Sequence, residues 1–244
     1  MIYFISDVHL GIQNRAEDKL RENLLLEFLE SITGKCDTLF IVGDLFDYWF
    51  EYRTVIPKYF YRTLTALGKL RESGAGIEYL MGNHDFGHRT FFEEEFGVTI
   101  HKNDIIRKIG VKKFYISHGD GKSYKDTGYK ILKRILRNRA AQFLFRLLHP
   151  DVGIGMASGS SRKSRVYTDK KSYGEGDGMR DFAAARISEG FDYVIMGHRH
   201  KLIHEKLGNG SYINLGEWIY NPSYAVFDGN ELITGSVAGF LGKT

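Results

Sequence analysis

Seven short apolar runs, rich in β-branched and aromatic residues, constrain the fold of this chain more than any other feature. Helical patterns at 17–32 and 59–73 separate the early runs. Strands that alternate with helices predict an α/β fold, and strands that are apolar throughout predict a sheet covered on both faces. The late runs lie close together with a turn at 228–230, so we expect antiparallel hairpins there. The seven runs are residues 2–6, 38–42, 77–81, 113–117, 193–196, 212–215 and 224–227.

Polar side chains follow five of these runs directly. Because the carboxyl ends of strands in an α/β sheet form ligand sites, we expect the five clusters to converge on one cleft. Carboxylate, amide and imidazole groups without a thiolate favour Mn, Fe, Zn or Co over a structural zinc site. They are too many for one tetrahedral ion and predict two divalent ions that share a bridging carboxylate. The clusters are Asp7 and His9; Asp44 and Asp47; Asn83, His84 and Asp85; His118 and Asp120; and His198 and His200.

Each of these clusters taken alone is weak evidence for a metal site. A Gly-Asp pair after a strand is commonly just a turn, and a lone Asp-x-His is commonly a surface pair. Their joint occurrence after five apolar runs favours the metal site. We expect the Asp-x-His and His-x-His pairs to lie on one face of extended segments. The remaining histidines are interpreted as structural: His88, His101, His149 and His204.

One segment of the chain is strongly basic. Residues 122–171 contain 13 Lys+Arg and 3 Asp+Glu, a net charge of +10, whereas the other residues contain 21 and 27, a net charge of −6. Such a local field predicts an anionic partner. The segment includes a basic amphipathic helix pattern at 128–149 and a Gly/Ser-rich stretch at 153–165. We therefore expect a single domain over 1–244 with a basic helical cap inserted at about 121–180.

Cysteine content and hydropathy exclude several classes of protein. The single cysteine, Cys36, excludes a disulfide framework and a cysteine-rich zinc module. The first residues show no basic leader and no cleavage site, and no run approaches the ~20 apolar residues of a membrane span. These features predict a cytoplasmic protein, with peripheral contact of the basic helix at the inner face of the cytoplasmic membrane.

The polar motifs resemble the full motif set of the calcineurin-like metallophosphoesterases. The resemblance implies a layered α/β fold of central mixed sheets flanked by helices, with a helical lid insertion. It also implies a metal-dependent phosphoric-ester or pyrophosphate hydrolase. The residues that carry it are Asp7-x-His9, Gly43-Asp44-x-x-Asp47, Gly82-Asn83-His84-Asp85, His118 and Gly197-His198-x-His200.

This resemblance also implies a role for each site residue. One ion would be held by Asp7, His9 and His200. The other would be held by Asn83, His118 and His198, and Asp44 would bridge the two. His84 would donate a proton to the leaving oxygen or stabilise the transferring phosphate, with Asp85 orienting the imidazole. Asp47 and Asp120 would support the ligands from behind.

A narrower resemblance concerns the stretch 117–129, the basic insertion after it and the length of the chain. These are similar to the UDP-2,3-diacylglucosamine pyrophosphohydrolases of lipid A synthesis. That family implies manganese and cleavage of UDP-2,3-diacylglucosamine to UMP and 2,3-diacylglucosamine 1-phosphate. Typical members carry Arg where this chain has His84. The candidate substrate contacts are Asp126, Tyr129, Arg162, Lys163, Arg165 and Arg199.

Two other interpretations remain open from the sequence. The first is a phosphodiesterase or phosphatase that acts on another nucleotide or phospholipid, which His84 favours. The second is a non-catalytic scaffold that binds nucleic acid or membrane through the basic segment. No motif ligand is missing, and the basic segment lacks the regular aromatic residues that stack on bases. We therefore expect an enzyme and no nucleic-acid partner.

Overall fold

Two β-sheets packed face to face form the centre of the molecule in the computed structural model, which describes residues 1–122, 133–156, 159 and 178–243. The first sheet has six strands in the order β11-β10-β1-β2-β3-β4. Its strands β1 to β4 run parallel, and β10 and β11 continue the sheet antiparallel. The bounds are β1 Ile2–Ile5, β2 Thr38–Val42, β3 Gly76–Leu80, β4 Thr99–His101, β10 Ser223–Phe227 and β11 Leu232–Ser236.

The second sheet has five strands in the order β5-β6-β7-β9-β8. Strands β6, β7 and β9 are parallel, and the edge strands β5 and β8 are antiparallel to their neighbours. Parallel central strands place their carboxyl ends at one edge, as in the first sheet. The bounds are β5 Ile105–Ile109, β6 Lys112–Ser117, β7 Tyr193–Met196, β8 Leu202–Leu207 and β9 Gly210–Leu215.

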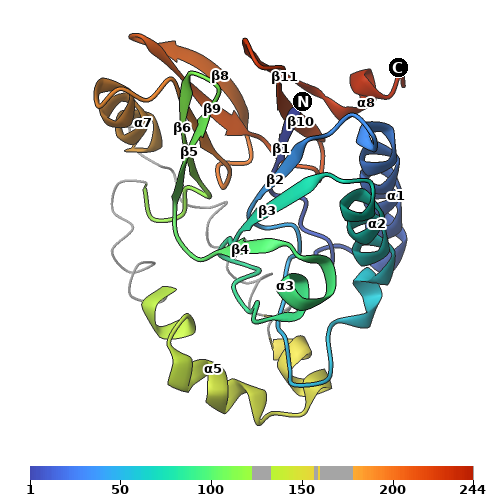
Figure 1. Ribbon diagram of the computed structural model, residues 1–244. Coiled ribbons are helices and arrows are strands. Elements are labelled where there is room, and N and C mark those ends of the chain that lie inside the picture. The colour runs from blue at the N-terminus through green and yellow to red at the C-terminus, as the bar shows by residue number, and fades with distance from the viewer. Residues whose placement is uncertain (123–132, 157–158, 160–177, 244) are drawn as a thin grey trace.

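Helices cover the outer faces of both sheets, which gives four layers (Figure 1). The first sheet is covered by α1 (Arg15–Ile32) and α2 (Tyr61–Glu72), and the second by α7 (Gly178–Ser188). The predicted fold class, mixed sheets flanked by helices, is confirmed. The remaining named helices are η1 (Lys58–Phe60), α3 (Phe91–Phe96), α5 (Arg139–Arg146) and α8 (Val237–Phe240).

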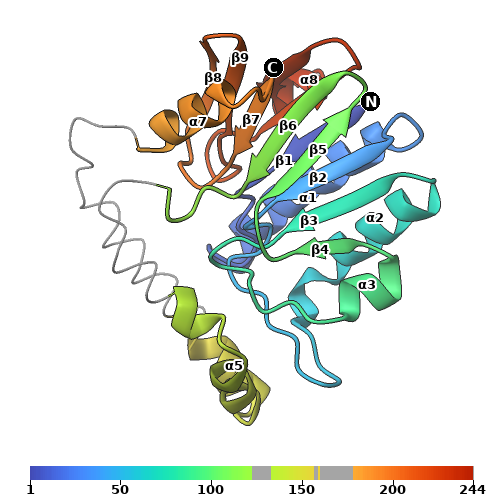
Figure 2. The same cartoon turned by 60° about the vertical axis from the view of Figure 1, so that its left-hand side comes forward.

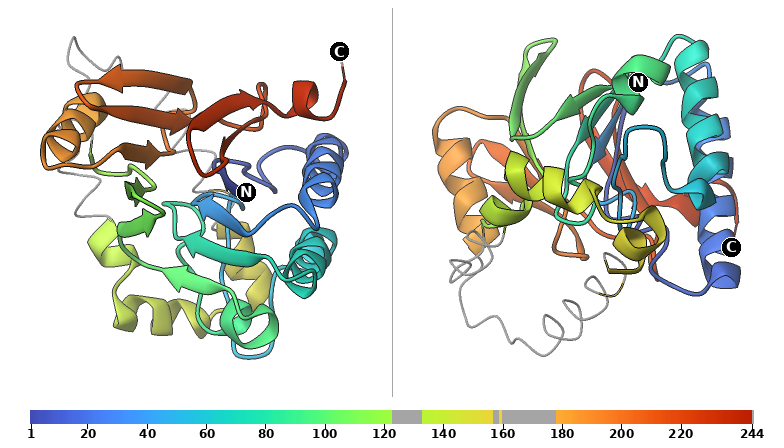
Figure 3. Two further views of the ribbon diagram at one scale, coloured as in Figure 1. Left: turned by 45° about the horizontal axis from the view of Figure 1, so that its top comes forward. Right: turned by 90° about the horizontal axis from the view of Figure 1, so that it is seen from below.

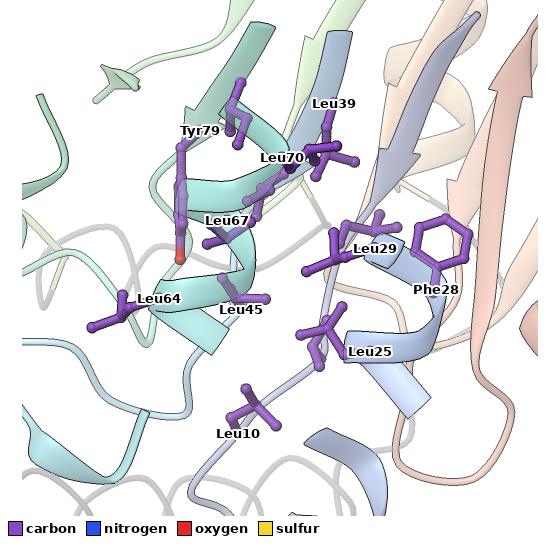
Figure 4. Close-up of a cluster of buried hydrophobic side chains, with 14 of the residues drawn as sticks. Leu10, Leu25, Phe28, Leu29, Leu39, Leu45, Leu64, Leu67, Leu70 and Tyr79 are labelled. Carbon is purple, nitrogen blue, oxygen red and sulfur yellow. The ribbon is translucent and has the colours of Figure 1, made fainter. Parts of the chain in front are cut away.

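Apolar packing holds the layers in place. Leucines of α1 and α2 pack on the first sheet, as Figure 4 shows for Leu29, Leu67 and Leu39. Between the sheets, the Phe4 ring stacks on Phe40 at a centroid distance of 5.0 Å and faces Phe114 of the second sheet at 6.2 Å. Burial of each such ring stabilises the fold by about 1.5–3 kcal/mol. The carboxyl ends of both sheets are thereby fixed relative to one another.

All seven predicted strands are present, and the antiparallel hairpin around 228–230 is confirmed by the pairing of β10 with β11. Asp228 Oδ1 caps this turn by accepting from the backbone nitrogens of Asn230 and Glu231. Strands β4, β5, β8 and β11 were not among the predicted runs. All four are edge strands, and β5 and β8 carry charged residues at exposed positions, so the apolar pattern of these two strands is weak.

The prediction of one continuous helix over 128–149 is wrong for residues 133–149, the part that the structure describes. Residues 133–136 are helical, the chain turns at Arg137, and α5 starts after Asn138. The Asn138 side chain accepts from the backbone nitrogens of Ala140 and Ala141. This N-cap satisfies donors that a continuous helix would bond internally, and it therefore favours a new helix start. A further helical stretch follows at 150–156, with Pro150 at its first position.

Helix α5 lies at the end of the molecule opposite both termini (Figures 1 and 2). Seen from below in the right-hand view of Figure 3, it crosses in front of the strands. Phe145 of α5 packs on Phe50 with ring centroids 4.6 Å apart, and Arg146 Nε donates to the Glu51 carbonyl. In the described part of the chain, no helix is long and apolar enough to cross a membrane.

The buried Glu51 carboxylate joins two loops near the carboxyl end of the first sheet. Its Oε1 accepts from Trp49 Nε1, and its Oε2 accepts from the backbone nitrogens of Arg89, Thr90 and Phe91 at 2.8–3.2 Å. Although burial raises the pKa of Glu51, hydrogen bonds from His88 and Trp49 bring it below its ordinary value of 4.5. The ionised carboxylate is therefore the form that the fold stabilises.

We expect Glu51→Gln to lower the free energy of unfolding by about 1–2 kcal/mol at pH 7, because charge-assisted bonds become neutral ones. The folded-state pKa is depressed, so this contribution is present above pH 4.5 and is lost as pH falls through the folded pKa. Urea unfolding from pH 7 to pH 3 measures the gap between the two proteins. Glu95→Gln, at an exposed position on α3, is the matched control. A gap that stays constant with pH contradicts the prediction.

Candidate metal centre

The carboxyl ends of the two sheets bring the predicted polar residues together. In the first sheet, the loop after β1 carries Asp7 and His9, the loop after β2 carries Asp44, and the loop after β3 carries Asn83. In the second sheet, the loop after β6 carries His118, and the loop after β7 carries His198 and His200. Backbone hydrogen bonds fix adjacent loops: Asp7 N donates to the Gly43 carbonyl, and Gly197 N donates to the His118 carbonyl. His and Asp side chains from both sheets form three overlapping groups: Asp7, His9 and His200; His9, Asp44 and His84; and Asp44, His118 and His198.

Left-handed backbone conformations mark this site. In the described part of the chain, positive φ occurs at only five residues other than glycine, and all five are candidate ligands. Such conformations cost free energy and persist where surrounding contacts enforce them. The prediction that the Asp-x-His and His-x-His pairs lie on extended segments was therefore wrong, because these residues turn away from the strand geometry. The values of φ are 53° for Asp7, 51° for His9, 55° for Asp44, 69° for His198 and 57° for His200.

The Asp7 carboxylate uses its two oxygens differently. Its Oδ2 accepts from Ser6 Oγ at 2.6 Å and from the backbone nitrogen of His198 at 2.9 Å, which ties the first sheet to the second. Its Oδ1 lies 3.3 Å from His200 Nε2 and 3.6 Å from His9 Nε2. The side chain is fully buried. One oxygen therefore has a structural role, and the other faces imidazole nitrogens.

Asp44 has the same division of roles. Its Oδ1 accepts from the backbone nitrogen of His84 at 2.9 Å. Its Oδ2 lies 3.3 Å from His118 Nε2 and 3.8 Å from His9 Nε2, so it stands between the two groups of histidines. Asn83 Oδ1 adjoins the group of Asp44, His118 and His198, at 3.0 Å from His118 Nε2.

The other nitrogen of two candidate ligands is oriented from behind. His118 Nδ1 lies 2.8 Å from the Val42 carbonyl, to which it donates, and this leaves Nε2 facing Asp44 and Asn83. His9 Nδ1 lies 3.4 Å from Asp47 Oδ1. Metal-bound histidines in proteins commonly have such a carbonyl or carboxylate partner, which fixes the tautomer.

The buried carboxylates of this cluster favour bound cations. Although burial raises the pKa of Asp44, His118 and His84 hold it well below its usual range. Burial lowers the pKa of His118, but the Asp44 carboxylate outweighs it and raises that pKa to about 10. Burial and the neighbouring His118 lower the pKa of His198 to about 4. The two buried carboxylates thus stay ionised, and buried carboxylates require positive charge nearby.

These observations fit a site for two metal ions. Asp7 Oδ1 and Asp44 Oδ2 are buried and have no hydrogen-bond partner among the described residues. Buried polar atoms in proteins are almost always satisfied, so such orphaned oxygens indicate a ligand. The nearby donors are carboxylate oxygen, amide oxygen and imidazole nitrogen, which suit borderline divalent ions.

Asp47, and not Asp85, lies against the His84 ring. His84 Nδ1 is 3.2 Å from the Asp47 carbonyl and 3.6 Å from Asp47 Oδ1. Asp85 instead accepts from the backbone nitrogens of Leu45 and Gly82, so it shapes the loop. The expectation that Asp85 orients the imidazole is corrected accordingly. His84 is 13% exposed, whereas His9 is fully buried, which places His84 at the opening of the site.

The other predicted site residues have different positions. Asp120 is buried beside His118 and forms an ion pair with Lys133 at 2.5 Å. Burial raises the pKa of Asp120, but His118 and Lys133 outweigh burial and lower that pKa below its ordinary value. Arg199 is exposed between His198 and His200. The remaining predicted substrate contacts lie outside the described residues: Asp126, Tyr129, Arg162, Lys163 and Arg165.

Comparison with known proteins identifies the family. The model of the calcineurin-like phosphoesterases matches residues 1–202. The chain belongs to the calcineurin-like phosphoesterase family. A Porphyromonas gingivalis protein named UDP-2,3-diacylglucosamine hydrolase is 35% identical over 97% of each chain, and a Haemophilus influenzae protein of that name is 28% identical over 90% of this chain and 91% of its own. A solved archaeal phosphodiesterase aligns over 96% of this chain and 98% of its own, with 18% identity and a TM-score of 0.48.

As a calcineurin-like phosphoesterase, the chain is a metal-dependent phosphoester hydrolase, and its Asp and His clusters fit two ions. The sequence did not indicate the residues that support this phosphoesterase site from a distance. Arg137, for example, donates to the carbonyls of Gly82 and Lys102. No local pattern links Arg137 with Gly82, because only the fold brings these segments together.

Two glycines, Gly43 and Gly82, leave room for candidate ligands because they have no Cβ. A Cβ at Gly82 would fall on the Asp44 carboxylate and 2.6 Å from the Asp44 nitrogen. A Cβ at Gly43, where φ is +84°, would lie 2.8 Å from the His118 ring carbon Cγ. Real side chains do not approach so closely, so a larger residue displaces a candidate ligand.

We expect Gly82→Ala to weaken Mn²⁺ binding by about 10–100-fold, as displacement of ligand supports does in metal sites. Calorimetric titration with Mn²⁺ measures the affinity. Gly155→Ala is the control, because its added Cβ meets no described atom within 4 Å. Wild-type affinity in the Gly82→Ala protein would contradict the steric argument.

Proposed function

We propose that the protein hydrolyses the diphosphate of UDP-2,3-diacylglucosamine to UMP and 2,3-diacylglucosamine 1-phosphate. The observation that carries this proposal is the full-length similarity to the Porphyromonas gingivalis protein of that name, together with the complete set of motif ligands at one site. The match covers 97% of each chain, so it includes the basic segment as well as the core.

Within this proposal, the site residues take the roles that the family resemblance implies. Asp7, His9 and His200 hold one ion. Asn83, His118 and His198 hold the other, and Asp44 lies between them. Two divalent ions, for which we propose manganese, would lower the pKa of a water molecule and bind phosphate oxygens. The chain itself supplies the arrangement of these ligands, in which Asp7, His9 and Asp44 are buried and His200 is exposed.

His84 is the proposed proton donor to the leaving oxygen. Its Nδ1 is held against the Asp47 carbonyl, so Nε2 is the nitrogen that can meet a substrate atom. Its partial exposure at the opening of the site supports contact with substrate. A positioned general acid contributes about 10²–10⁴-fold to the rate of such reactions.

Helix α5 supplies the proposed apolar contact for acyl chains and the membrane surface. In α5, none of the residues is buried, although Phe145 packs on the core. Phe143, Leu144 and Leu147 are each at least 60% exposed. A helix that presents apolar side chains among arginines binds at anionic lipid surfaces. We therefore propose that the protein works in the cytoplasm at the inner face of the membrane.

Phosphorus NMR of the products tests the proposed reaction. Manganese-loaded protein is incubated with UDP-2,3-diacylglucosamine, and we expect UMP and the lipid monophosphate to appear. Asn83→Ala should reduce this turnover by at least about 100-fold, because it removes a proposed ligand. An intact lipid substrate together with cleavage of bis-p-nitrophenyl phosphate would refute the proposed substrate and favour another phosphodiester, as His84 suggests.

A pair of exposed leucines tests the lipid contact. We expect Leu147→Glu, at the C-cap of α5, to weaken binding to phosphatidylglycerol vesicles about tenfold, because a charge replaces apolar contact in the bilayer interface. Leu20→Glu on α1 is the matched control, since the two leucines are 68% and 71% exposed. Co-sedimentation measures both proteins. Equal binding of Leu147→Glu and wild type would exclude α5 as the lipid contact.

A further inference from the structure

A pocket of about 260 Å³ opens beside the candidate metal centre. His118 lines it, so the pocket is continuous with the group formed by Asp44, His118 and His198. Its other walls come from the end of β3, the turn between β4 and β5, and the segment after β6. The cationic residues that line it are Lys102, Lys122, Lys133 and Arg137.

Positive charge exceeds negative charge in this pocket. Its two carboxylates are already paired: Asp104 with Lys122 at 2.6 Å, and Asp120 with Lys133 at 2.5 Å. Lys102 forms no ion pair or hydrogen bond through its ammonium group with any described residue. Arg137 likewise has no carboxylate partner there, because its guanidinium donates to backbone carbonyls. The lining therefore keeps a formal charge of +2 for an anion.

Arg137 is held so that it can bind an anion without rearrangement. Its Nη1 donates to the Lys102 carbonyl at 2.8 Å, and its Nη2 donates to the Gly82 carbonyl at 2.9 Å. With a longer contact to the Met81 carbonyl, the described bonds use three of five N–H donors. A planar guanidinium fixed in this way is suited to phosphate oxygens.

Size and lining restrict what the pocket can hold. Its volume equals roughly nine water molecules, which suits a small polar group. Leu80 and Met81 are its apolar lining residues, too few for an acyl chain. A group in this pocket is adjacent to one at the metal centre, as the two phosphates of a diphosphate are adjacent to each other.

We propose that this pocket binds the second phosphate of a diphosphate substrate, the one not attacked at the metal centre, through Lys102 and Arg137. The proposal rests on the proposed function in taking a diphosphate as substrate. It adds two specificity-determining residues that distinguish diphosphates from simple phosphodiesters. Charge-assisted bonds to a phosphate contribute enough to change affinity by about tenfold or more.

The difference between UDP and UMP isolates this second phosphate, because the two ligands share the base, the ribose and the first phosphate. Calorimetric titration of the manganese-loaded protein gives both dissociation constants. We expect wild type to prefer UDP, and Lys102→Ala to reduce that preference about tenfold. Lys108→Ala, at an exposed position on β5 outside the pocket, should preserve it. Arg137→Lys, which keeps the charge but not the planar fork, should reduce it as well.

Equal preference for UDP in wild type and Lys102→Ala would overturn the proposal, as would a uniform loss of affinity for both ligands. The lipid substrate separates this result from the proposed function. If the preference for UDP over UMP depends on Lys102 but the protein leaves UDP-2,3-diacylglucosamine intact, the proposed substrate is refuted and the proposed phosphate pocket is supported. Cleavage of that substrate with no dependence on Lys102 refutes the pocket and supports the proposed function.

Discussion

Two buried carboxylates, Asp7 and Asp44, organise the rest of this structure. Each uses one oxygen to accept a backbone N–H from a loop of another strand and directs the second toward imidazole nitrogens. For Asp7 the backbone partner is His198, which belongs to the other sheet. The same side chain therefore joins the two sheets and faces the site. Removal of either carboxylate would disturb the fold and the candidate centre together, since an unpaired buried donor is costly.

The price of this arrangement is local backbone strain. Five candidate ligands in the left-handed region are tolerated because strands on one side and cross-loop hydrogen bonds on the other enforce their conformation. Gly43 and Gly82 take no part in ligation, yet they leave room for the His118 ring and the Asp44 carboxylate. The close-packed apolar layer around Phe4 and Phe114 holds the two sheets together.

Much of the fold and the candidate site could be predicted because the informative patterns are local. Each apolar run and the polar residues after it are contiguous, so the strand and its functional end are found together. The partner of His84 could not be predicted in this way. Asp47 and Asp85 both belong to motifs, and only packing places Asp47 against the ring and Asp85 against Leu45. The break before α5 could have been predicted, because Asn138 is a strong N-cap residue. Helical periodicity on both sides of Asn138 favoured one continuous helix instead.

Arginine side chains of the basic segment donate to main-chain carbonyls of the loops at the site. Arg137 donates to the carbonyl of Gly82, the residue before Asn83, and Arg146 donates to the carbonyl of Glu51 in the loop that follows Asp47. The two loops that position His84 are thus both contacted by the segment that contains α5. Because carbonyl groups are present whatever the side chain, these contacts depend on loop shape and not on loop sequence. An anion bound by Lys102 and Arg137 would therefore contact the same guanidinium that holds the Gly82 carbonyl beside the candidate metal centre.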